Sequence, residues 1–321
     1  AFVCIALRSS LGIVAAGLSL TYAAQSSFFL SRAAMWYNNM DNMMTCVERL
    51  AHYDSYTGED DEIQCNLISQ EQLEIWPTQP TITFENVSMR YRPDLPQVLR
   101  NISLSIGAQE KIGICGRTGS GKSSFMSALF RLVEVDTGAI FIDSVNIAQV
   151  PVTTLRSKLT IIPQDPVLFS GKLRFNLDPS QTHDDEELWR VLKLVHLASY
   201  LKTQGGLDCE VAEKGSNFSI GQRQLLCIAR ALLRQSHIVV LDEATANVDI
   251  ESDKLIQEAI RTCFSQVTLL VIAHRLETIV HCDRILVLNQ GQVDEFDTPA
   301  NLIAQNGTFA SLLHQANLNR N

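Results

Sequence analysis

The sequence predicts an α/β fold with a mostly parallel sheet, preceded by a long apolar helix. Three observations support this class. From Thr81 onward, short apolar runs of strand length alternate with helical patterns, as in a sheet covered by helices. Residues 9–31 contain no charged side chain. A glycine-rich loop follows one of the apolar runs and precedes a helical pattern.

The uncharged segment 9–31 lies between Arg8 and Arg32 and is long enough to cross a bilayer, whose hydrocarbon core needs about 20 helical residues. Small residues such as Gly12 and Gly17 favour close approach of membrane helices. Serine and threonine are also frequent, so hydropathy alone leaves open a buried helix of a soluble domain. We predict a membrane span, with the buried helix as the alternative.

The residues after this segment lead into a linker. Met35, Met40 and Val47 recur with near-helical spacing, which predicts that the helix continues through residues 32–53. Residues 54–80 are first acidic and then proline-bearing, a composition typical of a solvated linker.

The chain therefore divides into three predicted parts. We expect the end of a transmembrane domain at 1–53, a linker at 54–80 and an α/β domain at 81–321. The sequence opens at Ala1 inside an apolar run and lacks the features of a signal peptide. We expect it to be a fragment of a longer protein.

Seven apolar runs predict the strands of the α/β domain. The first two flank a turn at Pro93 and Asp94. The other five are compact and apolar, as expected for strands buried on both faces of a parallel sheet. In chain order the predicted strands are Ile82–Val87, Val98–Ile106, Lys111–Cys115, Leu159–Ile162, Ile238–Leu241, Val267–Ile272 and Arg284–Leu288.

The overall composition excludes some classes of function. The formal net charge of -9 argues against a nucleic-acid partner, which favours a clustered basic surface. The 8 cysteines form no CxxC pair and no cluster with the spacing of a zinc site. We predict reduced thiols in a cytosolic domain.

The glycine-rich loop Gly116–Ser123 matches the pattern GxxxxGK[ST] in full, between the strand Lys111–Cys115 and a helical pattern that runs to about Leu132. In this context the pattern binds the phosphates of a nucleoside triphosphate. Glycines let backbone N–H groups turn toward the phosphates, and the helix N-terminus adds a positive dipole end. Lys122 is expected to contact the β- and γ-phosphates, and Ser123 to hold Mg²⁺. The alternative, an ordinary glycine-rich turn, is disfavoured by the context.

Two carboxylates follow the predicted strand Ile238–Leu241. Asp242 is expected to position Mg²⁺, and Glu243 to act as general base on the attacking water. Either residue alone could be an acidic strand end or a helix N-cap. Together with the phosphate loop they predict hydrolysis of a nucleoside triphosphate.

The segment Asn217–Gln224 narrows the class, because it resembles the signature motif LSGGQ of ABC ATPases. It precedes Asp242 and begins a predicted helix with Leu225, Ala229 and Leu232 on one apolar face. Further segments are similar to other motifs of that family: Tyr91 to the aromatic residue that stacks on adenine, Gln164 to the Q-loop, Ala246–Asp249 to the D-loop and His274 to the switch histidine.

Each of these residues has a plainer alternative when it is taken alone. Tyr91 could pack at a strand end, Gln164 could bond a loop backbone, and His274 could be a satisfied core histidine. The motifs nevertheless occur together in the order and spacing of the family, and the resemblance is strongest from Thr81 to about Phe296.

The resemblance implies the ABC ATPase form of the P-loop NTPase fold: a RecA-like core, an antiparallel β-subdomain and an α-helical subdomain. It implies that two such domains close head to tail around two ATP molecules, with Mg²⁺. The implied catalytic residues are Lys122, Gln164, Glu243 and His274, and the implied metal contacts are Ser123, Gln164 and Asp242. The implied nucleotide contacts are Tyr91, Gly116, Arg117, Thr118, Gly119, Ser120, Gly121, Lys122, Ser123, Ser124, Gln164 and Asp242 for one ATP, and Ser219, Gly221 and Gln222 for the other.

Finer matches favour the C subfamily, the multidrug-resistance-associated proteins, and their second nucleotide-binding domain. Gln222–Cys227 and Ile162–Gly171 resemble that domain, and Gly17–Ala23 resembles the last membrane helix of the group. The resemblance therefore favours a true membrane span over a buried helix. It implies an integral membrane protein with a cytosolic nucleotide-binding domain.

The implied function is ATP-driven export of organic anions or conjugates. The implied partners are the first nucleotide-binding domain and the transmembrane domains of the same protein. A channel or channel regulator of the same subfamily is the alternative. A soluble ABC ATPase of DNA repair or translation is disfavoured by the apolar helix and the acidic charge.

One residue departs from the signature consensus in a way that bears on chemistry. Ile220 stands where the consensus has glycine, and a β-branched side chain restricts the approach of the backbone to a phosphate. We expect the ATP site that uses this signature to hydrolyse poorly. The site built on Lys122 and Glu243 is expected to be the competent one.

Overall fold

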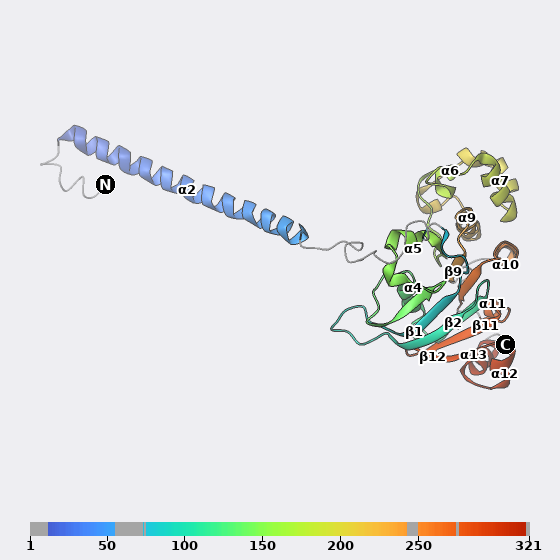
Figure 1. Cartoon of the computed structure of the whole chain (residues 1–321). Coiled ribbons are helices and arrows are strands. Elements are labelled where there is room, and N and C mark those ends of the chain that lie inside the picture. The colour runs from blue at the N-terminus through green and yellow to red at the C-terminus, as the bar shows by residue number, and fades with distance from the viewer. Residues whose placement is uncertain (1–11, 55–72, 74, 243–249, 274–275, 319–321) are drawn as a thin grey trace. The chain divides into compact units, whose positions relative to one another are not determined.

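The computed structural model describes residues 12–54, 73, 75–242, 250–273 and 276–318 of the chain. The chain divides into two compact units, Ala1–Glu62 and Ile63–Asn321. The first unit contains one long helix and the second an α/β domain (Figure 1). The division falls within the predicted linker.

A single 42-residue helix, α2 (Ile13–Asp54), makes up the described part of the first unit. It covers the predicted span from Ile13 onward together with the predicted continuation. None of its residues is buried, and by length and composition it could cross a membrane. The hydroxyls of Ser19, Thr21 and Ser26 donate to the carbonyls four residues earlier, at 2.8, 3.0 and 2.8 Å. These polar groups are therefore satisfied within the helix, as an apolar environment requires.

The second unit is built around a six-stranded sheet in which the five compact predicted strands lie side by side. All pairings are parallel except that of the edge strand β12, which runs antiparallel to β11 and was not predicted. In spatial order the strands are β12 (Gln292–Asp297), β11 (Arg284–Asn289), β3 (Lys111–Cys115), β10 (Thr268–Ile272), β9 (Ile238–Asp242) and β6 (Leu159–Ile162).

Both faces of this sheet are buried at its five parallel strands, which explains why these strands are mostly apolar. On β10, Leu270 and Ile272 face one hydrophobic cluster, whereas Leu269 and Val271 face the other. Such alternation follows from the twofold side-chain period of a strand. The prediction of a mostly parallel sheet is confirmed.

A second, antiparallel sheet covers the face of the central sheet on which Leu270 and Ile272 lie. Its order is β2 (Leu99–Ile106), β1 (Ile82–Met89), β4 (Thr137–Ile142) and β5 (Val145–Asn146). The predicted pair of strands and the turn between them are confirmed, with Leu95 N donating to Arg92 O at 3.0 Å. Phe84 of β1 stacks on Phe125 of α4 (Lys122–Leu129), with ring centroids 4.4 Å apart.

The last residues of the predicted linker pack onto this domain. Trp76 is 5% exposed and its Nε1 donates to Ile142 O at 2.9 Å. Thr78 donates from N and from Oγ1 to Asp143 Oδ2, at 2.7 and 2.8 Å. Pro80 O accepts from Thr268 Oγ1 at 2.7 Å. Residues 76–80 therefore belong structurally to the α/β domain.

A helical lobe lies beside the central sheet, where Figure 1 shows α6 and α7 grouped near α9. It contains α6 (Leu173–Leu177), α7 (Asp185–Leu194), α8 (Ala198–Thr203), α9 (Ile220–Leu233), the 3₁₀ turns η2 (Gly206–Asp208) and η3 (Glu213–Gly215), and the short pair β7 (Gly171–Lys172) and β8 (Glu210–Val211). The apolar side chains of α7 and α9 face each other in one cluster with the sheet.

The remaining helices pack around the two sheets: η1 (Ile147–Gln149), α5 (Val152–Lys158), α10 (Ile250–Cys263), α11 (Leu276–Ile279), α12 (Pro299–Ala304) and α13 (Thr308–Leu318).

Several predicted strand ends differ from the structure by one or two residues, and the predicted end of one helix is wrong. The helix after the phosphate loop ends at Leu129 rather than near Leu132, because Arg131 adopts a left-handed conformation with φ 47°. The six described cysteines are free thiols.

Candidate functional site

The carboxyl ends of three neighbouring strands meet at one edge of the central sheet. Ile114 of β3 pairs with Ile272 of β10, and Ile272 pairs with Asp242 of β9. This register places the loop after β3 and the carboxylate of Asp242 at the same edge, where open α/β sheets bind ligands. The structure therefore brings together two elements that are far apart in the sequence.

The loop between β3 and α4 has a backbone that only glycine adopts without strain. Gly116, Gly119 and Gly121 have φ of 151°, 79° and 106°. A Cβ atom on Gly116 would lie 2.3 Å from Leu288 O, whereas one on Gly119 would meet nothing within 4 Å. The loop thus packs tightly on its inner side and is open at Gly119.

The N-terminus of α4 has no side-chain cap. Gly121 occupies the N-cap position, and no side chain accepts a hydrogen bond from the first turn. The first N–H groups of a helix need partners and carry a positive dipole end. This helix end is therefore suited to bind an anion.

Lys122 folds back over the same loop. Its Nζ donates to Gly116 O at 2.8 Å and to Arg117 O at 3.3 Å, and the residue is 7% exposed. Burial lowers the pKa of Lys122, while the nearby charge of Asp242 acts to raise it. Burial raises the pKa of the Cys115 thiol to about 12, so this neighbour is neutral at physiological pH.

A buried hydroxyl in this loop has no hydrogen-bond partner within the described residues. Ser120 is 4% exposed, and its Oγ is the orphaned atom. Buried polar groups are almost always paired, so an orphan at a glycine-rich loop indicates a ligand or ordered solvent. The cradle, the buried lysine and this hydroxyl together fit the phosphates of a nucleoside triphosphate.

The other predicted residues for the first ATP lie before β2, within the loop itself, at the start of α4 and after β6. Tyr91 is 47% exposed, and its OH lies 2.9 Å from Oγ of the buried Ser124 in the first turn of α4. Arg117, Thr118 and Ser123 are exposed. Gln164 is also exposed, just beyond the carboxyl end of β6, and the hydrogen bond of Gln224 Nε2 to Pro163 O at 3.2 Å holds the backbone before it.

The predicted signature segment forms the start of α9 and caps itself. Ser219 Oγ accepts from Gln222 N at 3.1 Å, and Gln222 Oε1 accepts from Ser219 N at 3.0 Å, which is a complete capping box. Gly221 is buried, and Ile220 is 42% exposed. The side chain at the point of departure from the consensus therefore projects from the helix end.

Two predicted catalytic residues, Glu243 and His274, lie outside the described residues. The same holds for the segment Ala246–Asp249. Strand β9 ends at Asp242, directly before Glu243 in the sequence. Strand β10 ends at Ile272, two residues before His274.

Comparison with known proteins gives consistent results. Residues 99–246 match the family model described as ABC transporter. The chain is 48% identical over 312 residues to ATP-binding cassette sub-family C member 3 of Rattus norvegicus, covering 97% of this chain and 20% of that protein. It is 50% identical over 297 residues to ABC transporter C family member 3 of Dictyostelium discoideum, covering 92% and 21%.

A solved structure of a bacterial ABC exporter with ATP bound matches with a TM-score of 0.70 and 34% identity, over 74% of this chain and 42% of that one. The chain belongs to the ABC transporter family. The two relatives named above belong to the C subfamily, and the chain spans about a fifth of their length. The fold is that of an ABC ATPase, and membership in this family implies ATP binding by the α/β domain.

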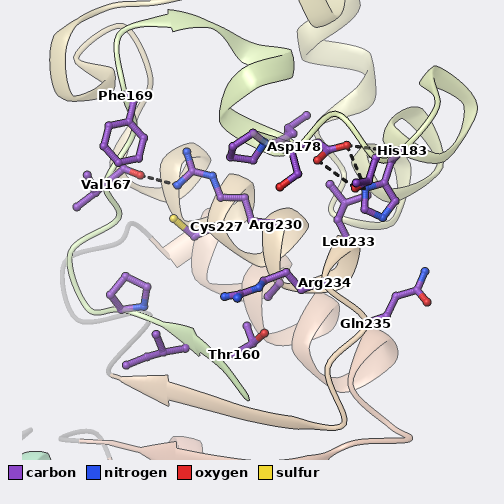
Figure 2. A pocket seen from close by; sticks show the side chains of 17 residues that line it. Thr160, Val167, Phe169, Asp178, His183, Cys227, Arg230, Leu233, Arg234 and Gln235 are labelled. Atoms are coloured by element: carbon purple, nitrogen blue, oxygen red, sulfur yellow. Dashed lines mark hydrogen bonds and ion pairs between the residues drawn. The ribbon is translucent and has the colours of Figure 1, made fainter. Parts of the chain in front are cut away.

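The ABC domain also has a groove between β6 and the helical lobe, with a volume of about 750 Å³ (Figure 2). Figure 2 shows Arg230 of α9 directed toward Val167, and Asp178 bonded to His183. Sequence reasoning did not single out these residues. The sequence did contain a signal for Arg230: it stands between Ala229 and Ala231 in a helix whose other residues are mostly apolar. A cation that is buried in such a helix needs a partner.

Proposed function

We propose that this chain binds and hydrolyses ATP and thereby drives export of organic anions or conjugates by the whole membrane protein. The observation that carries the proposal is the loop at the start of α4. It combines an uncapped helix N-terminus, the buried Lys122 and the orphaned Ser120 Oγ at the sheet edge that also holds Asp242. Dense negative charge is the ligand property that satisfies all of these groups.

The phosphates would displace the present intramolecular partners of Lys122. Its Nζ now donates to the Gly116 and Arg117 carbonyls, and a triphosphate would offer charged acceptors in their place. Tyr91 lies against Ser124 in the first turn of α4, which supports its proposed role under the adenine ring.

Mg²⁺ fits the oxygen and hydroxyl donors at this edge, and we assign it to Ser123, Gln164 and Asp242. Bound there, it would neutralise charge on the β- and γ-phosphates. Glu243 directly follows Asp242 at the end of β9, a position suited to a general base acting on water. His274 follows β10 on the neighbouring strand and would orient the γ-phosphate.

A second ATP would lie against the signature end of α9, with Ser219, Gly221 and Gln222 facing the first nucleotide-binding domain of the same protein. Positive helix ends stabilise anions, and closure of two domains excludes water. The exposed side chain of Ile220 supports the expectation that this second site hydrolyses poorly. In this proposal α2 is a membrane span and the ABC domain is cytosolic.

The first experiment measures transport by the whole protein in membrane vesicles. We expect ATP-dependent uptake of a glutathione conjugate, and loss of that uptake in Glu243→Gln. Unchanged uptake in the variant would remove this site from the transport cycle. ATP binding without uptake of any organic anion, together with ATP-gated current in the same membranes, would replace export with the channel function.

A binding measurement on the same variant separates its two steps. Glu243→Gln should keep ATP bound, because the phosphate cradle is intact, and should lose most turnover, because the base is missing. The expected decrease is about 10²- to 10⁴-fold, the usual contribution of general acid–base catalysis. Undiminished steady-state hydrolysis would contradict the role of Glu243.

A further inference from the structure

The helix α9 carries a largely buried cation in its C-terminal half. The guanidinium of Arg230 donates from Nη1 to Val167 O at 2.6 Å, from Nη2 to Asn176 Oδ1 at 2.8 Å, and from Nε to Asn176 O. Among the described residues no carboxylate forms an ion pair with it, and burial lowers its pKa. A buried charge is unfavourable unless it is hydrogen-bonded, and here the partners are three neutral oxygens and the thiol of Cys227.

Asn176 extends this contact to the neighbouring chain segment. It is 2% exposed, accepts from Phe169 N at 2.8 Å, and donates to Phe169 O at 2.7 Å and to Lys172 O at 3.2 Å. Arg230 and Asn176 therefore hold the backbone of residues 167–172, which forms one wall of the groove in Figure 2. We call residues 163–169 the groove segment.

A second contact joins the groove segment to α9 near the other end of the helix. Gln224 is 1% exposed, and its Nε2 donates to Pro163 O. The groove segment is thus bonded to α9 at Gln224 and at Arg230. Ser219 and Arg230 lie 11 residues apart on one uninterrupted helix, a rise of about 16 Å.

We propose that Arg230 is a positioning residue that fixes the signature end of α9 to the groove segment, so that the two move as one body. A displacement of the groove wall at Val167 would then shift Ser219 and Gly221. The consequence for nucleotide binding at the second ATP site rests on the proposed function of the signature, whereas the mechanical link does not.

The geometry explains why arginine occupies this position. Its planar fork reaches three oxygens that belong to two different points of the chain, at Val167 and Asn176. A lysine offers one ammonium group on a flexible stem and cannot bridge the same acceptors in a fixed geometry.

Hydrogen exchange of the whole protein tests the link. The variants are Arg230→Met, which removes the donors at similar volume, and Arg230→Lys, which keeps the charge. The matched control is Arg234→Met, because Arg234 lies one turn later at the C-cap of the same helix and lines the same groove. Within the described part of the chain it donates only to Arg156 O, at 3.4 Å. The rate of amide exchange is measured in two segments. Residues 167–177 include the amide of Phe169, which donates to Asn176 Oδ1. Residues 216–224 include the amide of Gln222, which donates to Ser219 Oγ.

We expect Arg230→Met to accelerate exchange about tenfold in both segments, the effect of losing a hydrogen bond to a charged group. Arg230→Lys should show the same two changes at smaller amplitude, and it remains informative if the methionine variant does not fold. Arg234→Met should leave both segments at the parent rate. Acceleration confined to residues 167–177, or an equal effect of Arg234→Met, would overturn the proposal.

Nucleotide retention gives a second readout that a purely local role would not move. Because the signature end of α9 faces the second ATP, Arg230→Met should weaken nucleotide binding at that second site about tenfold, while ATP affinity at the phosphate loop stays at the parent value. Equal loss of affinity at the two sites, or no loss at either, would contradict positioning of the signature. Absence of hydrolysis in the parent protein would instead refute the proposed function, and the exchange result would still stand or fall by itself.

Discussion

The two helix N-termini at the candidate site, those of α4 and α9, differ in how their first N–H groups are satisfied. At α4 the N-cap is Gly121 and no side chain caps the first turn. At α9 the N-cap is Ser219, which forms a complete capping box with Gln222. An uncapped helix end keeps its donors for a ligand, whereas a capped end is already stable in the free domain.

The two helix N-termini also differ in how deeply their side chains are buried. Lys122 and Ser120 beside α4 are buried, while Ser219 and Ile220 at α9 are exposed. The groups that would bind phosphate at this loop are therefore already buried within this chain. The signature end is a surface, suited to meet a second domain. The first site therefore depends on local chemistry, and the second depends on how α9 is positioned.

The largest effect is expected at the phosphate loop. Lys122→Met removes the cation that folds over the loop, and hydrolysis by the whole protein should fall by about 100-fold or more, as for loss of one preorganised electrostatic contact in a water-excluded site. Lys193→Met, on the exposed side of α7, is the matched control and should hydrolyse ATP at the parent rate. Similar losses in the two variants would break the distinction between this site and the rest of the surface.

A pair of glycine substitutions tests how tightly the loop is packed. Gly116→Ala places a Cβ 2.3 Å from Leu288 O and should destabilise the domain by about 1–3 kcal/mol in chemical denaturation. Gly119→Ala has open space and only the cost of a positive φ, about 1 kcal/mol. A larger loss for Gly119→Ala would show that the loop packs differently from this description.

The strands of the central sheet could be predicted from the sequence because burial on both faces leaves a continuous apolar run. The edge strand β12 was missed for the corresponding reason, since Gln292, Asp294 and Glu295 give it no such run. The strand β4 was missed because its residues Thr137 and Gly138 resemble a turn. The end of α4 could not be predicted, because the left-handed conformation of Arg131 depends on its bonds to Ile147 O and Val150 O.

At the signature end, the capping box predicts a moderate effect on stability. Ser219→Ala removes the acceptor for Gln222 N and should lower the free energy of unfolding by about 1 kcal/mol. Ser123→Ala, in the exposed first turn of α4, is the control and should leave stability within about 0.5 kcal/mol. Equal destabilisation would mean that the two helix ends are capped alike.

The smallest effect is expected where a side chain only adjusts the phosphate loop. Tyr91→Phe removes one hydrogen bond to Ser124 Oγ but keeps the ring, so the KM for ATP should rise by a factor of roughly three to ten. Tyr91→Ala should raise it further, because the stacking surface is lost. Identical KM values in all three proteins would remove Tyr91 from the nucleotide site.

The candidate site was predictable to the extent that its chemistry lies in contiguous motifs. The loop Gly116–Ser123 and the carboxylate of Asp242 could be placed at one sheet edge because parallel strands share their carboxyl ends. The link through Arg230 and Asn176 could not be predicted, since it joins side chains 54 residues apart through backbone carbonyls that no pattern marks.

Binding of ATP by the phosphate loop of this chain can be measured by hydrogen exchange of the whole protein. Glu243→Gln is compared with and without Mg-ATP, and Lys122→Met in that background is the control. We predict strong ATP-dependent protection of residues 116–124, lost in the control. Exchange in this segment that is the same with and without ATP, in a protein that still binds ATP, would contradict it.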